Sequence, residues 1–226
     1  MGRAGPPVVR AVVFDMDGVL VDSKPLHLAI TREVLGPAAT EDDATLTREF
    51  LGRPAGDMLA VMVRRHGLPG TLSEYQARYD ARVMARLAEP RTPRPGTVPL
   101  LAELRRRGCR LAVASSSEQR WVDAMLRALG LSAWFEVAIG GDAAARRKPA
   151  PDIYLLAAAR LGVSPASCVA VEDSPLGVEA ARAAGMTVVA FATPEVDTRR
   201  LSEAHRVIQS FQDFPFDLTD APLRTS

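Results

Sequence analysis

Short apolar runs alternate with amphipathic segments along the second half of the chain. The runs lie at 8–14, 110–114, 137–139, 168–171 and 187–191, with a weaker one at 206–208. Because they are rich in β-branched residues and almost wholly apolar, they are typical of strands buried on both faces. The segments at 98–107, 122–129, 152–161 and 175–184 place apolar residues at helical spacing, and glycine follows each of them. This alternation predicts a parallel sheet with helices on both of its faces.

Residues 24–94 break this alternation, because they offer helical patterns but no convincing strand. Three apolar stripes at helical spacing predict helices that pack on one another rather than a cofactor site: Leu26, Ile30, Val34 and Leu35; Met58, Leu59, Met62 and Val63; Tyr75, Tyr79, Val83 and Leu87. Prolines at 90, 93 and 95 mark the return to the sheet. We therefore expect a Rossmann-like α/β core of residues 1–23 and 95–226 with an inserted all-α domain, 24–94. The last segment, 211–226, is expected to be irregular and partly frayed.

The charge balance of the chain excludes several classes of partner. A formal net charge of +1 over 226 residues gives no field for nucleic acid or an anionic membrane. No apolar run approaches the roughly 18 residues that cross a bilayer, and residues 1–10 show no secretory-signal pattern. Cys109 and Cys168 lie in strand-like runs and are expected to be buried free thiols, which predicts a reducing, cytoplasmic location.

The basic residues are almost all arginine. Of the 28 basic residues only Lys24 and Lys148 are lysine. Chance accounts for a few surviving lysines in such a chain. Lys148 nevertheless stands beside Arg146 and Arg147, which indicates that arginine would not serve at this position, since lysine is a compact point charge suited to phosphate.

Acidic pairs follow two of the predicted strands. Asp15 and Asp17 come directly after the first strand, and Glu172 and Asp173 follow the fourth. The ends of parallel strands bind ligands, and two adjacent carboxylates stay together around a divalent cation or a shared proton. Taken singly, each pair is also compatible with a polar loop or a helix N-cap. If the two pairs face each other, they form an oxygen-lined site suited to Mg²⁺.

Hydroxyl groups follow the second strand. Ser115 and Ser116 lie at a strand-to-helix junction, where hydroxyls and backbone N–H groups can hold anionic oxygens. Taken alone, an ordinary helix cap is the better explanation of such serines, and Ser117 is expected to be one. Lys148 follows the third strand. The strands thus end, in chain order, with an acid pair, a hydroxyl, a lysine and a second acid pair.

Taken together, these motifs resemble the haloacid dehalogenase superfamily, most of whose members are phosphatases and phosphomutases. The resemblance spans residues 8–208 and is strongest with the branch of β-phosphoglucomutases and sugar-phosphate phosphatases, whose helical cap follows the first motif. It rests on four segments: Phe14-Asp15-Met16-Asp17-Gly18-Val19, Ala114-Ser115-Ser116-Ser117, Lys148-Pro149-Ala150-Pro151-Asp152 and Glu172-Asp173-Ser174.

The resemblance implies a role for each acidic residue. Asp15 would be the nucleophile that forms an aspartyl phosphate. Mg²⁺ would be held by the Asp15 side chain, the Asp17 backbone carbonyl and Asp173, with Glu172 as a direct or outer partner. Asp17 would act as general acid and then base, and crowding by other acids is expected to raise its pKa. Because the dehalogenases lack this second aspartate, Asp17 argues against dehalogenation.

The remaining roles concern the phosphoryl group and the substrate. Ser115, Ser116 and Lys148 would hold the transferring phosphoryl oxygens. The residues 25–147 contain no lysine, which argues against the Schiff-base chemistry of the phosphonate-cleaving members. The resemblance therefore implies a phosphatase of a small phosphorylated metabolite, above all a sugar phosphate, with no evident need for a protein partner.

A hexose phosphate mutase like β-phosphoglucomutase is the alternative. Such mutases hold a second phosphate with a cap arginine, but alignment places Ala55 there, and Arg53 is the nearest replacement. His27 matches a histidine that those mutases use to restrain the counterpart of Asp17, although a hinge histidine satisfied by its neighbours is an equal explanation. Arg78 could meet a substrate or lie on a solvated helix face. A fold kept only for binding is a third reading, and it predicts no turnover.

Overall fold

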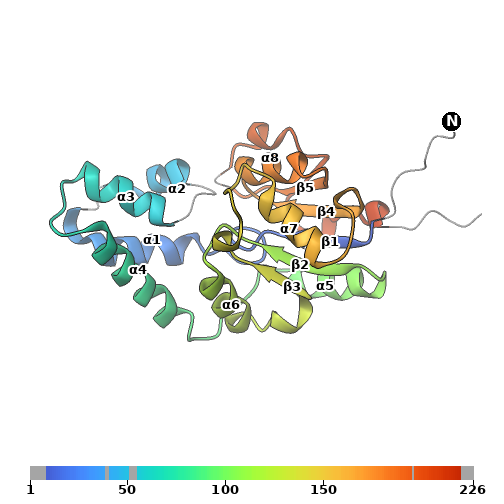
Figure 1. Ribbon diagram of the computed structural model, residues 1–226, viewed down its shortest axis with the longest axis horizontal. Coiled ribbons are helices and arrows are strands. Elements are labelled where there is room, and N and C mark those ends of the chain that lie inside the picture. The colour runs from blue at the N-terminus through green and yellow to red at the C-terminus, as the bar shows by residue number, and fades with distance from the viewer. Residues whose placement is uncertain (1–8, 39–40, 51–54, 195, 220–226) are drawn as a thin grey trace, which may run out of the picture.

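A six-stranded parallel sheet forms the centre of the larger part of the molecule (Figure 1). The computed structural model describes residues 9–38, 41–50, 55–194 and 196–219. The strands run in the spatial order β3-β2-β1-β4-β5-β6, and every neighbouring pair is parallel. Their bounds are β1 Ala11–Phe14, β2 Arg110–Ala114, β3 Val137–Ile139, β4 Cys168–Glu172, β5 Thr187–Phe191 and β6 Arg206–Ile208. The predicted α/β class is confirmed, since each strand lies on a predicted apolar run.

Eight α-helices accompany these strands in the described part of the chain. They are α1 Lys24–Leu35, α2 Asp43–Phe50, α3 Ala55–Arg65, α4 Leu72–Arg86, α5 Thr97–Arg106, α6 Gln119–Ala128, α7 Asp152–Arg160 and α8 Pro175–Ala183. Short 3₁₀ turns lie at Gly36–Ala38, Ser132–Trp134, Gly141–Ala143, Pro165–Ser167, Thr198–Leu201, Phe211–Asp213 and Phe216–Thr219. Helices α5 to α8 fall within three residues of their predicted bounds, because their apolar spacing and terminal glycines define them locally.

The two faces of the sheet carry separate hydrophobic cores. Side chains alternate along a strand, so Val12 and Phe14 pack on the face covered by α5 and α6. Ala11 and Val13 pack on the opposite face with α7 and α8. Both faces are therefore covered by helices, which explains why β1 is apolar at all four positions and fully buried.

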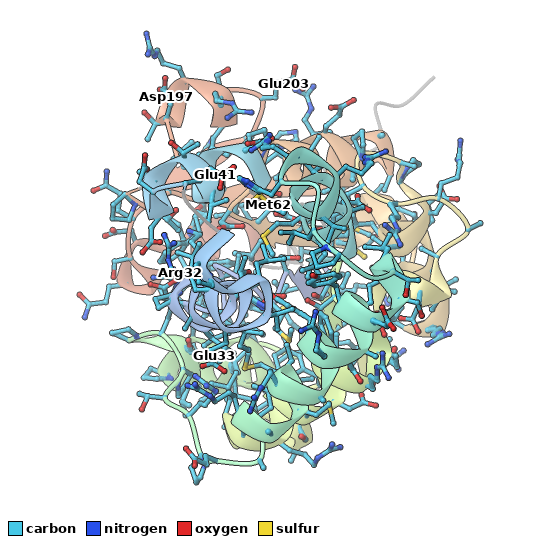
Figure 2. All side chains as sticks on the ribbon, turned by 90° about the vertical axis from the view of Figure 1, so that its left-hand side faces the viewer. Arg32, Glu33, Glu41, Met62, Asp197 and Glu203 are labelled. Atoms are coloured by element: carbon cyan, nitrogen blue, oxygen red, sulfur yellow. The ribbon has the colours of Figure 1, made fainter. Side chains whose placement is uncertain are left out.

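Helices α1 to α4 form a group of their own beside the sheet, at the left of Figure 1. The three predicted stripes pack inside this group, where Ile30 and Met62 are fully buried. Figure 2 views the molecule from this side and shows Met62 among the helices and Glu33 toward the edge of the group. Helix α2 was not predicted individually. Its pattern is weak, because among its described side chains only Leu46 is buried.

The C-terminal segment differs from the expectation of a frayed tail as far as residue 219. Phe211 and Phe214 are buried, and the Phe211 ring lies 4.8 Å from that of Phe191 on β5. Aromatic burial thus holds a segment that has no strand or helix periodicity. Cys109 and Cys168 are buried free thiols, as predicted. Among the described residues, no helix combines the length and apolar character needed to cross a membrane.

Candidate active site

The predicted catalytic residues that follow the strands gather where the strand order reverses. The chain winds outward from β1 through β2 to β3, and then returns to place β4 on the other side of β1. Loops diverge at such a switch point and leave a crevice beyond the strand ends. Asp15 follows β1, Ser115 follows β2 and Glu172 ends β4. The topology therefore brings residues more than 150 positions apart in sequence into one site.

Three carboxylates form the centre of this site. Asp15, Glu172 and Asp173 each offer an oxygen, and these oxygens lie within 4.8 Å of one another. The residues are only 6%, 0% and 3% exposed. Glu172 Oε2 accepts hydrogen bonds from the backbone N–H groups of Asp173 and Ser174. Asp173 Oδ2, in contrast, is buried without a hydrogen-bond partner among the described residues.

Lys148 is the main counter-charge of this cluster. Its Nζ donates to Asp15 Oδ1 at 2.7 Å, to Glu172 Oε1 at 2.5 Å and to the Ala114 carbonyl oxygen at 3.1 Å. Burial would lower the lysine pKa, but the two carboxylates outweigh it and hold the Lys148 pKa above its ordinary value. Tyr154 Oη also donates to Glu172 Oε1, at 2.6 Å. The lysine predicted from its isolation among arginines thus lies inside the carboxylate cluster.

The donor set and its electrostatics fit a divalent cation. Burial raises the pKa of Asp15 above its ordinary value, although Lys148 opposes the shift. Burial and the neighbouring Glu172 raise the pKa of Asp173 to about 7, against the opposing lysines. Three clustered carboxylate oxygens are hard ligands of the kind that Mg²⁺ and Ca²⁺ take. A cation would supply the partner that Asp173 Oδ2 lacks and would relieve the mutual repulsion of the three acids.

Glycines at two positions allow the acids to pack so closely. A Cβ on Gly18 would lie 1.9 Å from Asp173 Oδ2, and one on Gly177 would lie 1.8 Å from Glu172 Oε1. Gly18 also has a φ of +90°, in the left-handed region. Gly18 N–H donates to the Val21 carbonyl oxygen, so the chain turns back on itself after Gly18. This turn brings Ser23 close to Asp17.

Asp17 lies in a different environment from Asp15. Its Oδ1 accepts from Ser23 Oγ at 2.5 Å, and its Oδ2 accepts from Ser117 Oγ at 2.8 Å and from Ser115 Oγ at 3.2 Å. Burial alone would raise its pKa, but the nearby imidazole and the serine hydroxyls outweigh burial and lower the Asp17 pKa to about 2. The expectation that crowding raises this pKa is therefore wrong, because the Asp17 side chain is surrounded by donors rather than by acids.

His27 connects Asp17 to the helical group. Its Nε2 lies 3.8 Å from Asp17 Oδ1, and its Nδ1 lies 2.8 Å from Tyr79 Oη on α4. The rings of Tyr79 and Trp121 pack around it, at centroid distances of 6.2 and 6.3 Å. Trp121 belongs to α6 and donates its indole N–H to Asp80 of α4 at 2.6 Å. His27 therefore lies where α1 and α4 meet the sheet-bearing part of the chain.

Three further predicted residues remain, Arg78, Arg53 and Ser116. Arg78 is exposed, and its guanidinium lies 4.3 Å from the centre of the Tyr75 ring, which fits the solvated-face reading. Arg53 lies outside the described residues. Ser116 is half-buried, and its carbonyl oxygen backs closely onto Gly141, where a Cβ would come within 2.7 Å.

Several residues that contact the site were not predicted to do so. Ser117 was expected to cap a helix, but Glu118 precedes α6 at the N-cap position and the Ser117 hydroxyl donates to Asp17. Ser23 and Tyr154 carried no sequence signal, since each acts through a contact with a distant residue. Lys24 did carry one, as the other lysine of an arginine-rich chain. Its Nζ lies 3.7 Å from Asp173 Oδ2.

Comparison with known proteins agrees with this geometry. A family profile described as haloacid dehalogenase-like hydrolase matches residues 9–185. A phosphorylated carbohydrates phosphatase of Thermotoga maritima is 36% identical over 181 residues, 79% of this chain and 82% of the relative. A fructose-1-phosphate phosphatase of Escherichia coli is 33% identical over 183 residues, 79% of this chain and 94% of the relative. The crystal structure of CbbY from Rhodobacter sphaeroides in complex with phosphate superimposes with a TM-score of 0.80 at 30% identity, covering 92% of this chain and 97% of that one.

Proposed function

Because this chain belongs to the haloacid dehalogenase-like hydrolases, we propose that it is a phosphatase of a small phosphorylated metabolite, above all a sugar phosphate. The observation that carries the proposal is the buried arrangement of Asp15, Lys148, Glu172 and Asp173, with Asp17 held separately beside it. The phosphatase names of two relatives support the same reaction and point to carbohydrate substrates.

Asp15 is the proposed nucleophile. Its carboxylate attacks phosphorus, the bond to the leaving alkoxide oxygen breaks, and an aspartyl phosphate forms that water then hydrolyses. The Lys148 ammonium holds Asp15 Oδ1 at 2.7 Å and so limits the rotation of the carboxylate. Burial in a crevice keeps bulk water away from the reacting carboxylate.

Asp17 is the proposed general acid and base. It protonates the leaving alkoxide and later accepts a proton from the attacking water. In the ligand-free protein its pKa of about 2 keeps it ionised, which is the form that accepts a proton. The acid step requires its pKa to rise, and the approach of an anionic phosphate together with a shift of its serine and histidine donors would raise it.

The proposed metal is Mg²⁺, with Asp15, Glu172 and Asp173 as its side-chain ligands. When bound, the ion screens the repulsion between the attacking carboxylate and the phosphate oxygens. The Asp17 backbone carbonyl remains a predicted further ligand. Glu172 is so fully engaged by Lys148, Tyr154 and backbone N–H groups that it also fixes the position of Lys148.

Ser115, Ser116 and Lys148 are proposed to bind the phosphoryl oxygens. Ser115 and Ser116 begin the loop between β2 and α6, close to Asp17, and Lys148 supplies a positive charge at Asp15. Hydrogen-bond donors that are fixed before the substrate arrives stabilise the charge that develops on the transferring group. Binding of the phosphoryl group exchanges some of the present contacts of Lys148 for contacts with phosphate.

Residues 24–94 are proposed to act as a cap over this site, with 1–23 and 95–226 as the catalytic core. Its helices lie apart from the sheet in Figure 1 and meet the core through Tyr79 and Asp80. A cap that closes excludes water and supplies specificity. His27, Arg78 and Arg53 are the proposed cap residues for the substrate, and His27 Nε2 lies 3.8 Å from Asp17 Oδ1.

An activity assay on the purified full chain tests this function. With Mg²⁺ and a panel of sugar phosphates, we expect phosphate release that Asp15→Asn lowers about 1,000-fold or more, since the nucleophile is removed. Asp22→Asn is the matched control, because Asp22 is an exposed acid in the same segment and its loss leaves activity near the wild-type level. Equal phosphate release by Asp15→Asn and the wild type would contradict the proposal.

A mutase activity is the second candidate, and the approach of His27 to Asp17 favours it. It predicts conversion of a sugar 1-phosphate to the 6-phosphate, stimulated by a bisphosphate, with little net phosphate release. Following isomerised product in the same assay separates the two reactions. A folded protein that binds Mg²⁺ but shows neither reaction on any substrate would support the binding-only reading.

The partners and the cellular location of the protein are proposed from its composition. The net charge of +1 offers nothing to attract nucleic acid, and every proposed catalytic role is filled within this chain, without a protein partner. The two buried free thiols agree with a reducing compartment. We propose a cytoplasmic enzyme on these grounds.

A further inference from the structure

Both lysines of this chain lie at the same carboxylate cluster. Of the 28 basic residues only Lys24 and Lys148 are lysine. Lys148 Nζ donates to Asp15 at 2.7 Å, and Lys24 Nζ lies 3.7 Å from Asp173 Oδ2 on another side. A lysine ammonium is a compact point charge, unlike the broad planar guanidinium of arginine. The chain thus places its two compact organic cations where a compact metal cation would bind.

The position of the Lys24 ammonium is defined by two contacts of its Nζ. It is the first residue of α1, at the junction of the helical group with the sheet. Its side chain is 17% exposed, and its Nζ donates to Thr193 Oγ1 at 3.1 Å in the segment that follows β5. Thr193 itself is buried. The ammonium is therefore held beside Asp173 rather than extended into solvent.

Lys24 compensates the charge of Asp173 but does not satisfy its hydrogen-bonding capacity. Its Oδ2 is buried and has no hydrogen-bond partner among the described residues, and a distance of 3.7 Å provides charge compensation without a hydrogen bond. A divalent cation on the same carboxylate would lie a few ångström from the ammonium. Like charges so close in a buried site repel strongly, so both cations are not expected to keep these positions.

We propose that Lys24 is an internal counter-cation that neutralises Asp173 in the metal-free protein and competes with the divalent metal for it. The inference rests on the metal site of the proposed function. Lys24 acts through Asp173 and is a positioning residue. In this scheme the metal displaces the ammonium from Asp173, and the wild-type chain binds the metal more weakly than its three carboxylates alone would allow.

Calorimetric titration of the full chain with Mg²⁺, without any substrate, tests the competition. We expect Lys24→Met to bind Mg²⁺ about tenfold more tightly, because one repulsive charge is removed. Lys24→Arg keeps the charge, so its affinity should remain closer to that of the wild type than that of Lys24→Met does. Arg147→Met is the control, since it removes a positive charge that pairs with Asp57 at 3.0 Å outside the cluster. Equal or weaker binding by Lys24→Met would overturn the inference, and so would the absence of Mg²⁺ binding to both proteins.

A second measurement follows the wild-type chain and uses a variant only to assign a signal. Selective ¹⁵N labelling of lysine yields two side-chain ammonium signals, and Lys24→Arg identifies that of Lys24. We expect Mg²⁺ to shift the Lys24 signal and to speed its exchange with water. A Lys24 signal that stays unchanged while Mg²⁺ binds would overturn the inference. Because no substrate is present, a chain that shows this displacement but hydrolyses no phosphate would contradict the proposed function alone.

Discussion

Asp15 and Asp17 are separated by one residue but lie in environments that shift their pKa values in opposite directions. Burial among other acids raises the pKa of Asp15, whereas serine hydroxyls and an imidazole lower that of Asp17 to about 2. Side chains two apart on extended backbone start toward the same side, and the turn at Gly18 then brings Ser23 to Asp17. Environments that separate two neighbouring carboxyl groups allow them different chemical roles, here nucleophile and proton carrier.

Gly18 is the residue on which this local arrangement depends most directly. A methyl group at Gly18 would overlap Asp173 Oδ2 at 1.9 Å, so we expect Gly18→Ala to displace Asp173 and abolish Mg²⁺ binding. Because alanine is strained at the φ of +90° that Gly18 adopts, the substitution also destabilises the fold by about 1–2 kcal/mol. Gly185→Ala is the control, because Gly185 has a φ of +80° but nothing within 4 Å of its Cβ position. Calorimetry and urea denaturation measure both effects, and Mg²⁺ binding retained by Gly18→Ala would contradict this account.

At the scale of elements, periodic segments could be predicted and contacts between segments could not. The strands and α5 to α8 follow from local spacing alone, as Val12 and Phe14 illustrate by alternating with Ala11 and Val13 between the two cores. Helix α2 was not predicted, because few of its described side chains are buried and its apolar pattern is therefore weak. The hydrogen bond from Ser117 to Asp17 spans 100 positions, and a serine after a strand gives no local sign of such a partner.

The contact between α4 and α6 is expected to hold the helical group on the sheet. Trp121 Nε1–H donates to Asp80 Oδ1 at 2.6 Å, so Trp121→Phe removes the donor and keeps an aromatic ring. We expect a loss of about 1.5–3 kcal/mol for this charge-assisted bond, with faster amide exchange in α4 than in β1. Trp134→Phe is the matched control, since no hydrogen bond of the Trp134 indole is found in the described part of the chain. Unchanged exchange in α4 would show that this contact does not restrain the helices.

At the scale of the whole molecule, the sequence predicts that the four motifs lie together in one site. It does not predict how the charges of the buried carboxylates in that site are compensated. Motifs at the carboxyl ends of neighbouring parallel strands converge at one end of the sheet. Asp15, Lys148 and Glu172 meet there through hydrogen bonds, and Ser115 joins them through Asp17. The sequence could not reveal that Asp173 is buried with an oxygen that has no hydrogen-bond partner in the described part of the chain, or that Lys24 lies beside it. Both facts depend on how the start of α1 packs against the ends of β4 and β5, which no local pattern encodes.

The stability of the whole molecule should therefore depend on pH and Mg²⁺ together. The Asp173 pKa rises from its ordinary value of 3.8 to about 7 on folding, because burial and then Glu172 raise it while both lysines oppose the shift. The folded metal-free protein thus binds more protons than the unfolded chain between pH 4 and 7, and it loses stability as pH rises through that window.

Mg²⁺ requires the ionised carboxylate, so its affinity should increase about tenfold between pH 6 and pH 8. We expect the rise in thermal midpoint at a fixed, subsaturating Mg²⁺ concentration to be larger at pH 8 than at pH 6, measured by calorimetry. In Asp173→Asn, which cannot ionise at this position, both the Mg²⁺ effect and its pH dependence should be much smaller. An equal gain at the two pH values in the wild type would mean that Asp173 is already ionised in the folded metal-free protein. In that case the neutralising effect of Lys24 and Lys148 outweighs burial, and the carboxylate cluster would be ready for the metal without losing a proton.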